Sequence, residues 1–99
     1  MFGLTDNTIT LINGVLAKYP QVKEAIIYGS RARGDYRNGS DIDLTLKGED
    51  ISNTILSKLE WDIDDLLLPY FFDISIYSKL HNPAFINSID TEGKVFYQA

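Results

Sequence analysis

A polar stretch between two apolar runs constrains the fold of this chain more than any other feature. It reads GSRARGDYRNGSDIDL, from Gly29 to Leu44, and it follows the run VKEAIIY. That run is short, mostly apolar and rich in β-branched residues, which favours a buried strand over a helix. From Asp41 onward polar and apolar residues alternate, the period of a half-buried strand, so Asp41 and Asp43 share one face. The polar stretch is therefore a loop between two strands, and it leads directly into a pair of aspartates.

Two longer helices are predicted around this unit. After Thr5 and Asp6, both plausible helix-capping residues, apolar side chains recur at three- and four-residue spacing, and Pro20 ends the pattern. A second amphipathic stripe runs through ISNTILSKLEWDIDDLL and is closed at Pro69. Its apolar members are Ile51, Ile55, Leu59, Ile63 and Leu66 or Leu67.

The remaining segments predict two more strands and a short helix. In FFDISIY the alternation returns and places Asp73 on an outward face. Asn82 before Pro83 opens a helix through about Asp90, and EGKVFYQ then gives a turn and a closing strand. We therefore expect one α/β (α+β) domain over residues 1–99, with a mixed sheet of about four strands flanked by helices.

Composition excludes several classes of protein. Nine basic and 14 acidic residues give a formal net charge of −5, which disfavours broad nucleic-acid binding. No stretch has the roughly 20 consecutive apolar residues of a membrane span, and the N-terminus lacks the pattern of a signal peptide, so we expect a cytoplasmic protein. Since the chain has no cysteine, any metal must be held by oxygen ligands.

The aspartates are the candidate metal ligands. Asp41 and Asp43 lie close enough on one strand face to repel each other, and such a pair needs a cation, a proton or solvent to relieve it. Oxygen ligands of this kind suit Mg²⁺ or Mn²⁺. A solvated edge strand is the alternative for an isolated Asp-x-Asp pair. If the strand that carries Asp73 neighbours the first, however, three carboxylates converge on one patch.

Gly29 and Ser30 are candidates for phosphate binding. A glycine lets a ligand approach the backbone, and the following N–H groups together with the Ser30 hydroxyl can donate hydrogen bonds to a phosphate. A tight turn with no ligand is the alternative explanation of these two residues.

Taken together, these residues resemble a known family. Gly29-Ser30, ten intervening residues, Asp41-Ile42-Asp43 and a later Asp73 on a strand are similar to the pattern of nucleotidyltransferases of the DNA polymerase β superfamily, in particular the minimal nucleotidyltransferases. The resemblance implies two Mg²⁺ ions on Asp41, Asp43 and Asp73, with Asp73 also helping to deprotonate the attacking hydroxyl. It implies ATP as substrate, with Gly29, Ser30, Arg31, Arg33 and Ser40 as nucleotide-binding residues.

The resemblance also implies a partner and a reaction. Minimal nucleotidyltransferases are commonly paired with a small helical protein of the HEPN class, as the antitoxin of a toxin–antitoxin pair that transfers AMP to a toxin tyrosine. Two other functions stay open: a module that binds nucleotide and neutralises its partner by contact alone, and a small-molecule nucleotidyltransferase similar to the aminoglycoside-modifying enzymes.

Aromatic residues outside the loop are expected to be structural. We predict core positions for Trp61, Phe71, Phe72, Phe85 and Phe96. Tyr36 lies in the loop and is expected to be exposed, with a nucleotide contact as the alternative. The acidic run EWDIDD is expected to be a solvated helix face, with a partner-facing surface as the alternative.

Overall fold

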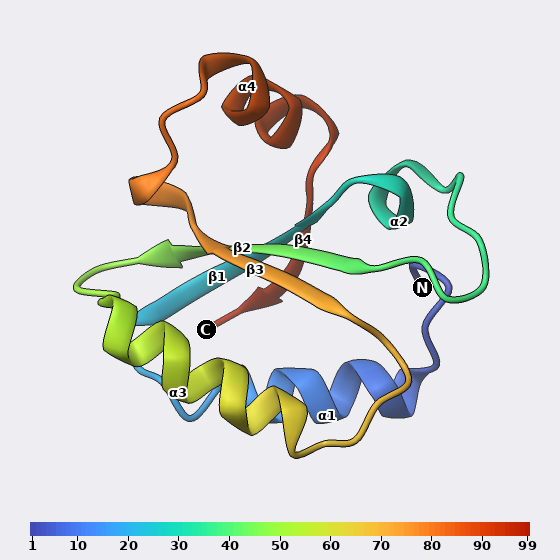
Figure 1. Ribbon diagram of the computed structural model, residues 1–99, viewed down its shortest axis with the longest axis horizontal. Coiled ribbons are helices and arrows are strands. Elements are labelled where there is room, and N and C mark those ends of the chain that lie inside the picture. Colours follow the sequence, from blue (N-terminus) through green and yellow to red (C-terminus); the bar gives the residue numbers. More distant parts are fainter.

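The computed structural model describes the whole chain, from Met1 to Ala99, as helices packed on both faces of one sheet (Figure 1). The element order agrees with the sequence prediction and adds a one-turn helix after the first strand and a 3₁₀ turn after the third. The elements are α1 (Asp6–Leu16), β1 (Val22–Tyr28), α2 (Ser30–Arg33), β2 (Ile42–Gly48), α3 (Asn53–Asp64), β3 (Phe72–Ile76), η1 (Tyr77–Lys79), α4 (Pro83–Glu92) and β4 (Lys94–Gln98).

The four strands form a mixed sheet in the order β3-β2-β1-β4. β1 pairs antiparallel with both β2 and β4, whereas β2 and β3 run parallel. In this register Tyr28 is opposite Asp43, and Asp43 is opposite Asp73. The alternation of each strand therefore places these three residues side by side on the same face of the sheet.

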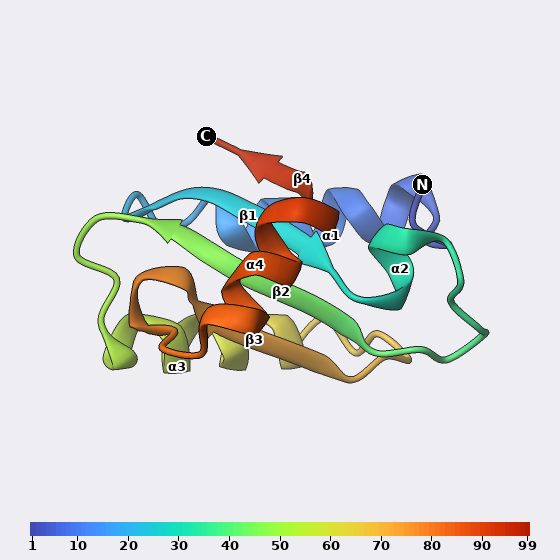
Figure 2. The same ribbon diagram turned by 90° about the horizontal axis from the view of Figure 1, so that it is seen from above.

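The two faces of the sheet are covered differently, as Figures 1 and 2 show. α1 and α3 lie together on one face, where Ile12, Leu16, Leu59 and Ile63 join the main hydrophobic core. α4 lies on the opposite face. There Ile89 packs with Ile26 and Tyr28 in a smaller cluster above β1, so the aspartate face is only partly covered.

Side-chain caps explain where the helices begin. The Thr5 and Ser52 hydroxyls accept hydrogen bonds from the Thr8 and Ile55 N–H groups, both at 3.1 Å. The Asn82 side chain accepts from the N–H groups of Ala84 and Phe85. Each cap satisfies backbone donors that lack a partner in a first helical turn. None of the helices combines the length and the apolar composition that crossing a membrane requires.

Three of the five predicted core aromatics are on the surface. Trp61 is 71% exposed and Phe71 is 81% exposed, whereas Phe96 is buried as predicted. Trp61 lies on α3 between the buried Leu59 and Ile63, and a helix turns such an intermediate position away from the stripe. Phe71 precedes Phe72, which packs against the main core, so strand alternation sends Phe71 outward. Phe85, 37% exposed, is at the margin of the smaller cluster, where its ring meets Tyr28 edge-on.

Candidate active site

A row of polar side chains crosses the three adjacent strands β1, β2 and β3. Asp43 on β2 is paired with Asp73 on β3, which confirms the expectation that the two aspartate strands are neighbours. Asp41 is exposed and lies one residue before β2. Its neighbour Ile42 donates its N–H to the Phe71 carbonyl at 2.9 Å, which fixes the start of β2 against the approach to β3. The fold thus brings the three predicted carboxylates to one end of the parallel strand pair.

The electrostatics of Asp43 reflect this crowding. Partial burial, followed by the negative charges of Asp73 and Asp41, raises the pKa of the Asp43 carboxyl, and the charges of Arg31 and Arg33 oppose this. A raised carboxyl pKa means that the ionised form is disfavoured where it stands. A bound cation would reverse this cost, because it favours the ionised form of all three aspartates.

Gly29 joins the turn after β1 to this carboxylate row. Its backbone angles, φ 74° and ψ −155°, lie in a region that only glycine adopts readily. A Cβ built at residue 29 would lie 2.5 Å from Oδ2 of Asp43, so the carboxylate fills the space that a side chain would take. Ser30 begins α2 next to it, and the first N–H groups of a helix have no partner within the helix. The Asp43 carboxylate therefore packs against the turn that leads into these N–H groups.

Tyr28 is a member of the site that the sequence analysis missed. It is buried, and burial, followed by the charge of Asp73, raises the pKa of its hydroxyl to about 12. The hydroxyl therefore stays protonated at neutral pH beside two carboxylates. A pocket of about 180 Å³ opens next to it, between the Gly29 turn and the Phe85 and Ser88 side chains of α4. Tyr28 belongs to the site because it is paired with Asp43 on the neighbouring strand. The sequence alone does not reveal this pairing, since it depends on the order of the strands in the sheet.

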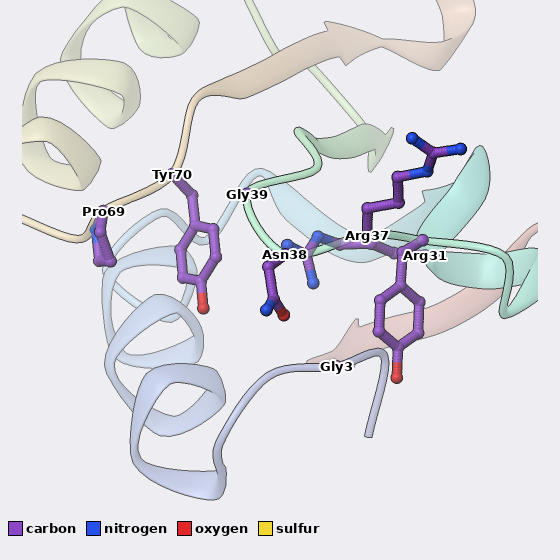
Figure 3. Close-up of a pocket in the computed structure, with 8 residues that line it drawn as sticks. Gly3, Arg31, Arg37, Asn38, Gly39, Pro69 and Tyr70 are labelled. Atoms are coloured by element: carbon purple, nitrogen blue, oxygen red, sulfur yellow. The ribbon is translucent and has the colours of Figure 1, made fainter.

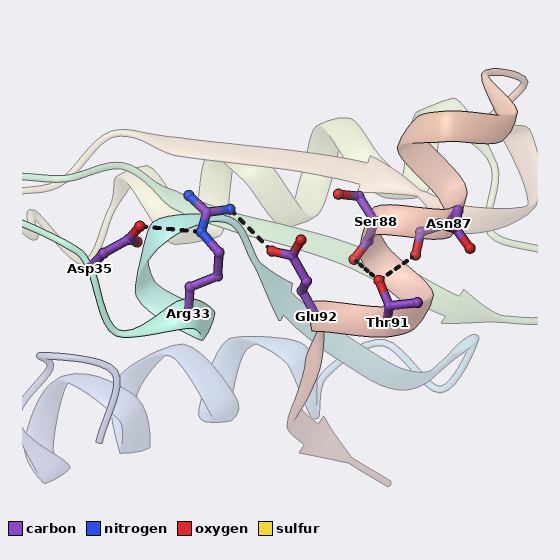
Figure 4. A network of polar contacts seen from close by, with 6 residues as sticks. All are labelled: Arg33, Asp35, Asn87, Ser88, Thr91 and Glu92. Carbon is purple, nitrogen blue, oxygen red and sulfur yellow. Dashed lines mark hydrogen bonds and ion pairs between the residues drawn. The ribbon is translucent and has the colours of Figure 1, made fainter.

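Arg33 spans the gap between α2 and α4. Its guanidinium forms ion pairs with Asp35 at 3.4 Å and with Glu92, near the end of α4, at 3.3 Å (Figure 4). The hydrogen bond to Glu92, followed by that to Asp35, raises the pKa of Arg33 further. Arg33 is exposed and borders the same pocket as Gly29, so it stands where a phosphate tail could compete for it.

Arg31, unlike the exposed Arg33, is buried. It is 3% exposed, and its donors go to main-chain carbonyls: Nε and Nη2 to Ser40, at 3.0 and 2.8 Å, and Nη1 to Phe2, at 2.9 Å. Arg31 is thus held by main-chain carbonyls and does not line the pocket beside Gly29, so its expected role in nucleotide binding stays a prediction. Arg31 fastens the loop. Ser40 acts in the same way, since its hydroxyl accepts the Arg37 N–H at 2.8 Å and its carbonyl holds Arg31.

The possible metal ligands, Asp41, Asp43 and Asp73, suit a hard divalent cation, because all of them offer carboxylate oxygens. Asp43 and Asp73 are paired on neighbouring strands. Because neighbouring strands lie about 4.8 Å apart, two such carboxylates can bind one ion. No three His, Cys, Asp or Glu side chains converge closely enough to form a complete metal-binding group. Without a cation the three carboxylates repel one another. To bind one shared ion, their side chains would have to turn toward each other.

Comparison with known proteins agrees with this geometry. Residues 11–99 match the family model described as polymerase beta, nucleotidyltransferase. A protein of Methanocaldococcus jannaschii named "Putative protein adenylyltransferase" is 30% identical over an alignment of 90 residues that covers 87% of this chain and 90% of that protein. The chain belongs to the polymerase β nucleotidyltransferase family.

Solved structures show the same fold. A chain in the crystal structure of a toxin–antitoxin with AMP-PNP matches with a TM-score of 0.73 and 20% identity, over 97% of this chain and 75% of that chain. A chain in the structure of a tri-AMPylated HEPN toxin of Shewanella oneidensis in complex with an MNT antitoxin matches with a TM-score of 0.71 and 16% identity, over 97% and 74%. The predicted fold class and family resemblance are confirmed.

Proposed function

We propose that this protein transfers AMP from ATP to a hydroxyl acceptor, a tyrosine of a helical HEPN-type partner for which it acts as antitoxin. The observation that carries the proposal is the contact between the Gly29 turn and Asp43, with Asp73 paired beside it on β3. This contact joins a phosphate-binding element to a carboxylate row, the combination that nucleotidyl transfer needs.

The turn and Arg33 would hold the triphosphate. The Ser30 hydroxyl and the unpaired N–H groups of the first turn of α2 donate to the β and γ phosphates. Arg33 leaves Glu92 or Asp35 to neutralise the tail, since a guanidinium fork matches phosphate oxygens. Both interactions place the α phosphorus over the aspartate row.

The carboxylates would hold Mg²⁺ and manage the acceptor proton. Asp41, Asp43 and Asp73 are the ligands, and Mg²⁺ when bound would stabilise the charge on the attacking and leaving oxygens. Asp73 is exposed at the margin of the row and accepts the proton of the acceptor hydroxyl. The acceptor oxygen forms a bond to the α phosphorus, the bond between this phosphorus and the bridging oxygen breaks, and pyrophosphate leaves.

The acceptor would come from a partner. The structural relative from Shewanella oneidensis is a complex with a tri-AMPylated HEPN toxin, which supports a protein hydroxyl as acceptor. Phe71 supports a contact surface at the site itself, since it is 81% exposed and its carbonyl is bonded to the residue after Asp41. The exposed Phe71 ring also supports a second candidate function, in which the protein neutralises its partner by contact alone.

Intact mass spectrometry of the partner tests the proposal. The partner, or a HEPN protein captured with this chain, is incubated with the chain and MgATP. We expect the mass to rise by whole AMP units, and not to rise with the Asp41→Asn, Asp43→Asn double variant. An unchanged mass despite a stable complex would favour neutralisation by contact, and a small-molecule acceptor would be sought if no complex forms.

A further inference from the structure

Arg31 carries a buried charge that forms no ion pair, although this charge acts on Asp43 and lowers the pKa of its carboxyl. Both ion pairs of the structure belong to Arg33, and no carboxylate lies within 4.0 Å of the Arg31 guanidinium. Three of its five N–H donors bond to carbonyl oxygens, which leaves two without a partner. A buried cation is costly unless it is paired, so this arrangement favours an anion beside it.

A pocket of about 270 Å³ lies beside this guanidinium. Figure 3 shows Tyr70 and Asn38 at the pocket with Arg31. The Cζ atom of Arg31 lies 4.9 Å from the centre of the Tyr70 ring and 5.5 Å from that of the Tyr36 ring. No lining residue carries a carboxylate, and the Arg37 side chain extends away from the pocket (Figure 3). In a chain with a net charge of −5, the Arg31 guanidinium therefore lies beside a pocket whose lining carries no negative charge.

Three further lining residues, Tyr36, Tyr70 and Asn38, carry side-chain hydrogen-bond donors that form no intramolecular hydrogen bond. Neutral donors around a guanidinium can satisfy several oxygens of one tetrahedral anion, and a guanidinium binds phosphate through two parallel bonds. The donor set therefore fits a phosphate group better than a carboxylate, which offers only two oxygens.

We propose that the pocket between Tyr36 and Tyr70 binds a phosphate group at a site separate from the Gly29 turn. Its lining residues include neither Gly29, Ser30 nor any of the three aspartates. The bound anion would brace the loop, because Arg31 holds the carbonyl of Ser40 and the next residue is Asp41. This inference does not depend on nucleotidyl transfer.

Phosphate titration followed by NMR tests the site. The ¹⁵N-labelled full chain is titrated with sodium phosphate in EDTA at constant ionic strength, so that no divalent ion is present. We expect saturable shifts at the Arg31 Nε–H and at the Asn38 and Gly39 amides. Shifts that never saturate, or that are confined to Gly29 and Ser30, would overturn the proposal.

Two tyrosine variants make the test specific. Tyr70→Phe removes one pocket hydroxyl and should weaken phosphate binding about tenfold, since hydrogen bonds to charged groups are among the stronger ones. Tyr97→Phe on β4 is the matched control and should bind as the unaltered chain does. Equal affinities of the two variants would contradict the site even if Arg31→Lys fails to fold.

A parallel titration with AMP identifies the source of the phosphate group. Saturation of the same residues by AMP would indicate a nucleotide phosphate, whereas saturation by inorganic phosphate alone would indicate a free anion. Because neither titration involves transfer, a negative result here leaves the proposed reaction intact, and a failed AMP transfer leaves this site intact.

Discussion

Oδ2 of Asp43 occupies the position that a side chain at residue 29 would need, 2.5 Å from where the Cβ would stand. The turn that follows β1 and the carboxylate of β2 therefore depend on each other. Glycine is required twice at this point, once for its backbone angles and once for the approach of the carboxylate.

Gly29→Ala should destabilise the protein and impair the site. The backbone strain alone is worth roughly 1–3 kcal/mol in the free energy of unfolding, and the new methyl group displaces Asp43 as well. Urea denaturation followed by circular dichroism measures the change. Gly14→Ala is the matched control: residue 14 lies inside α1 with no atom within 4 Å of the new Cβ, so alanine should stabilise by about 0.5–1 kcal/mol. A Gly29→Ala variant as stable as the unaltered chain would contradict the close approach.

Asp43→Asn should separate activity from stability. Loss of a metal ligand removes several kcal/mol of transition-state stabilisation, so AMP transfer should fall roughly a thousandfold or more. The fold, in contrast, should become no less stable at neutral pH, since the carboxylate is disfavoured by burial and by Asp73. Transfer is followed by intact mass and stability by thermal unfolding in EDTA, with Asp50→Asn in an exposed turn as control. Near-normal transfer by Asp43→Asn would refute the assignment.

The same raised pKa predicts a pH dependence with a definite sign. Because the folded-state pKa of Asp43 lies above that of the unfolded chain, the protonated form contributes stability that is lost as pH rises through the folded-state pKa. Without divalent ions, the difference in stability between Asp43→Asn and the unaltered chain should therefore grow with rising pH across that range. A difference that shrinks would mean that the carboxylate is instead stabilised as an anion.

Local patterns in the sequence predicted most of this fold. Period-two alternation identified β2 and β3, and the capping residues Thr5 and Asn82 mark helix starts that the structure confirms. The second helix ends earlier than predicted, at Asp64, because Leu67 adopts a positive φ of 56° outside the helix. A proline at residue 69 limits how far a helix can extend but does not fix its last residue.

What the sequence could not predict depends on contacts between distant segments. The membership of Tyr28 follows from its register against Asp43, which no local pattern contains. The role of Arg31 follows from carbonyls at Phe2 and Ser40, and a loop arginine gives no local sign that it is buried. The exposure of Phe71 could not be predicted either, because the sequence does not show which of the adjacent residues Phe71 and Phe72 points into the core.

Tyr28 should titrate as an unusually weak acid. Its pKa of about 12 exceeds the ordinary value because the hydroxyl is buried and faces Asp73. The neutral hydroxyl thus contributes stability that is present below pH 10, the usual range of tyrosine, and is lost as pH approaches about 12. Absorbance of tyrosinate at alkaline pH should lose one step near pH 12 in Tyr28→Phe. Tyr19, whose pKa is raised to about 12 by its hydrogen bond to Asp62, gives the comparison through Tyr19→Phe. If Tyr28→Phe instead lost a step near pH 10, the hydroxyl would titrate as an ordinary tyrosine and its burial beside Asp73 would be contradicted.

Glu92→Gln should strengthen binding of the triphosphate. In the structure Glu92 and Asp35 both hold Arg33, and a phosphate tail must compete with them for the guanidinium. Because exposed ion pairs are weak, removing one competitor should lower the KM for MgATP by only roughly two- to fivefold, with kcat little changed. The gain should vanish in the Arg33→Gln background, which distinguishes release of Arg33 from a general reduction of negative charge. Glu60→Gln on α3 removes the same charge at an exposed position and should leave KM unaltered. A KM that rises in Glu92→Gln would instead show that the ion pair holds Arg33 in the position that binds the nucleotide.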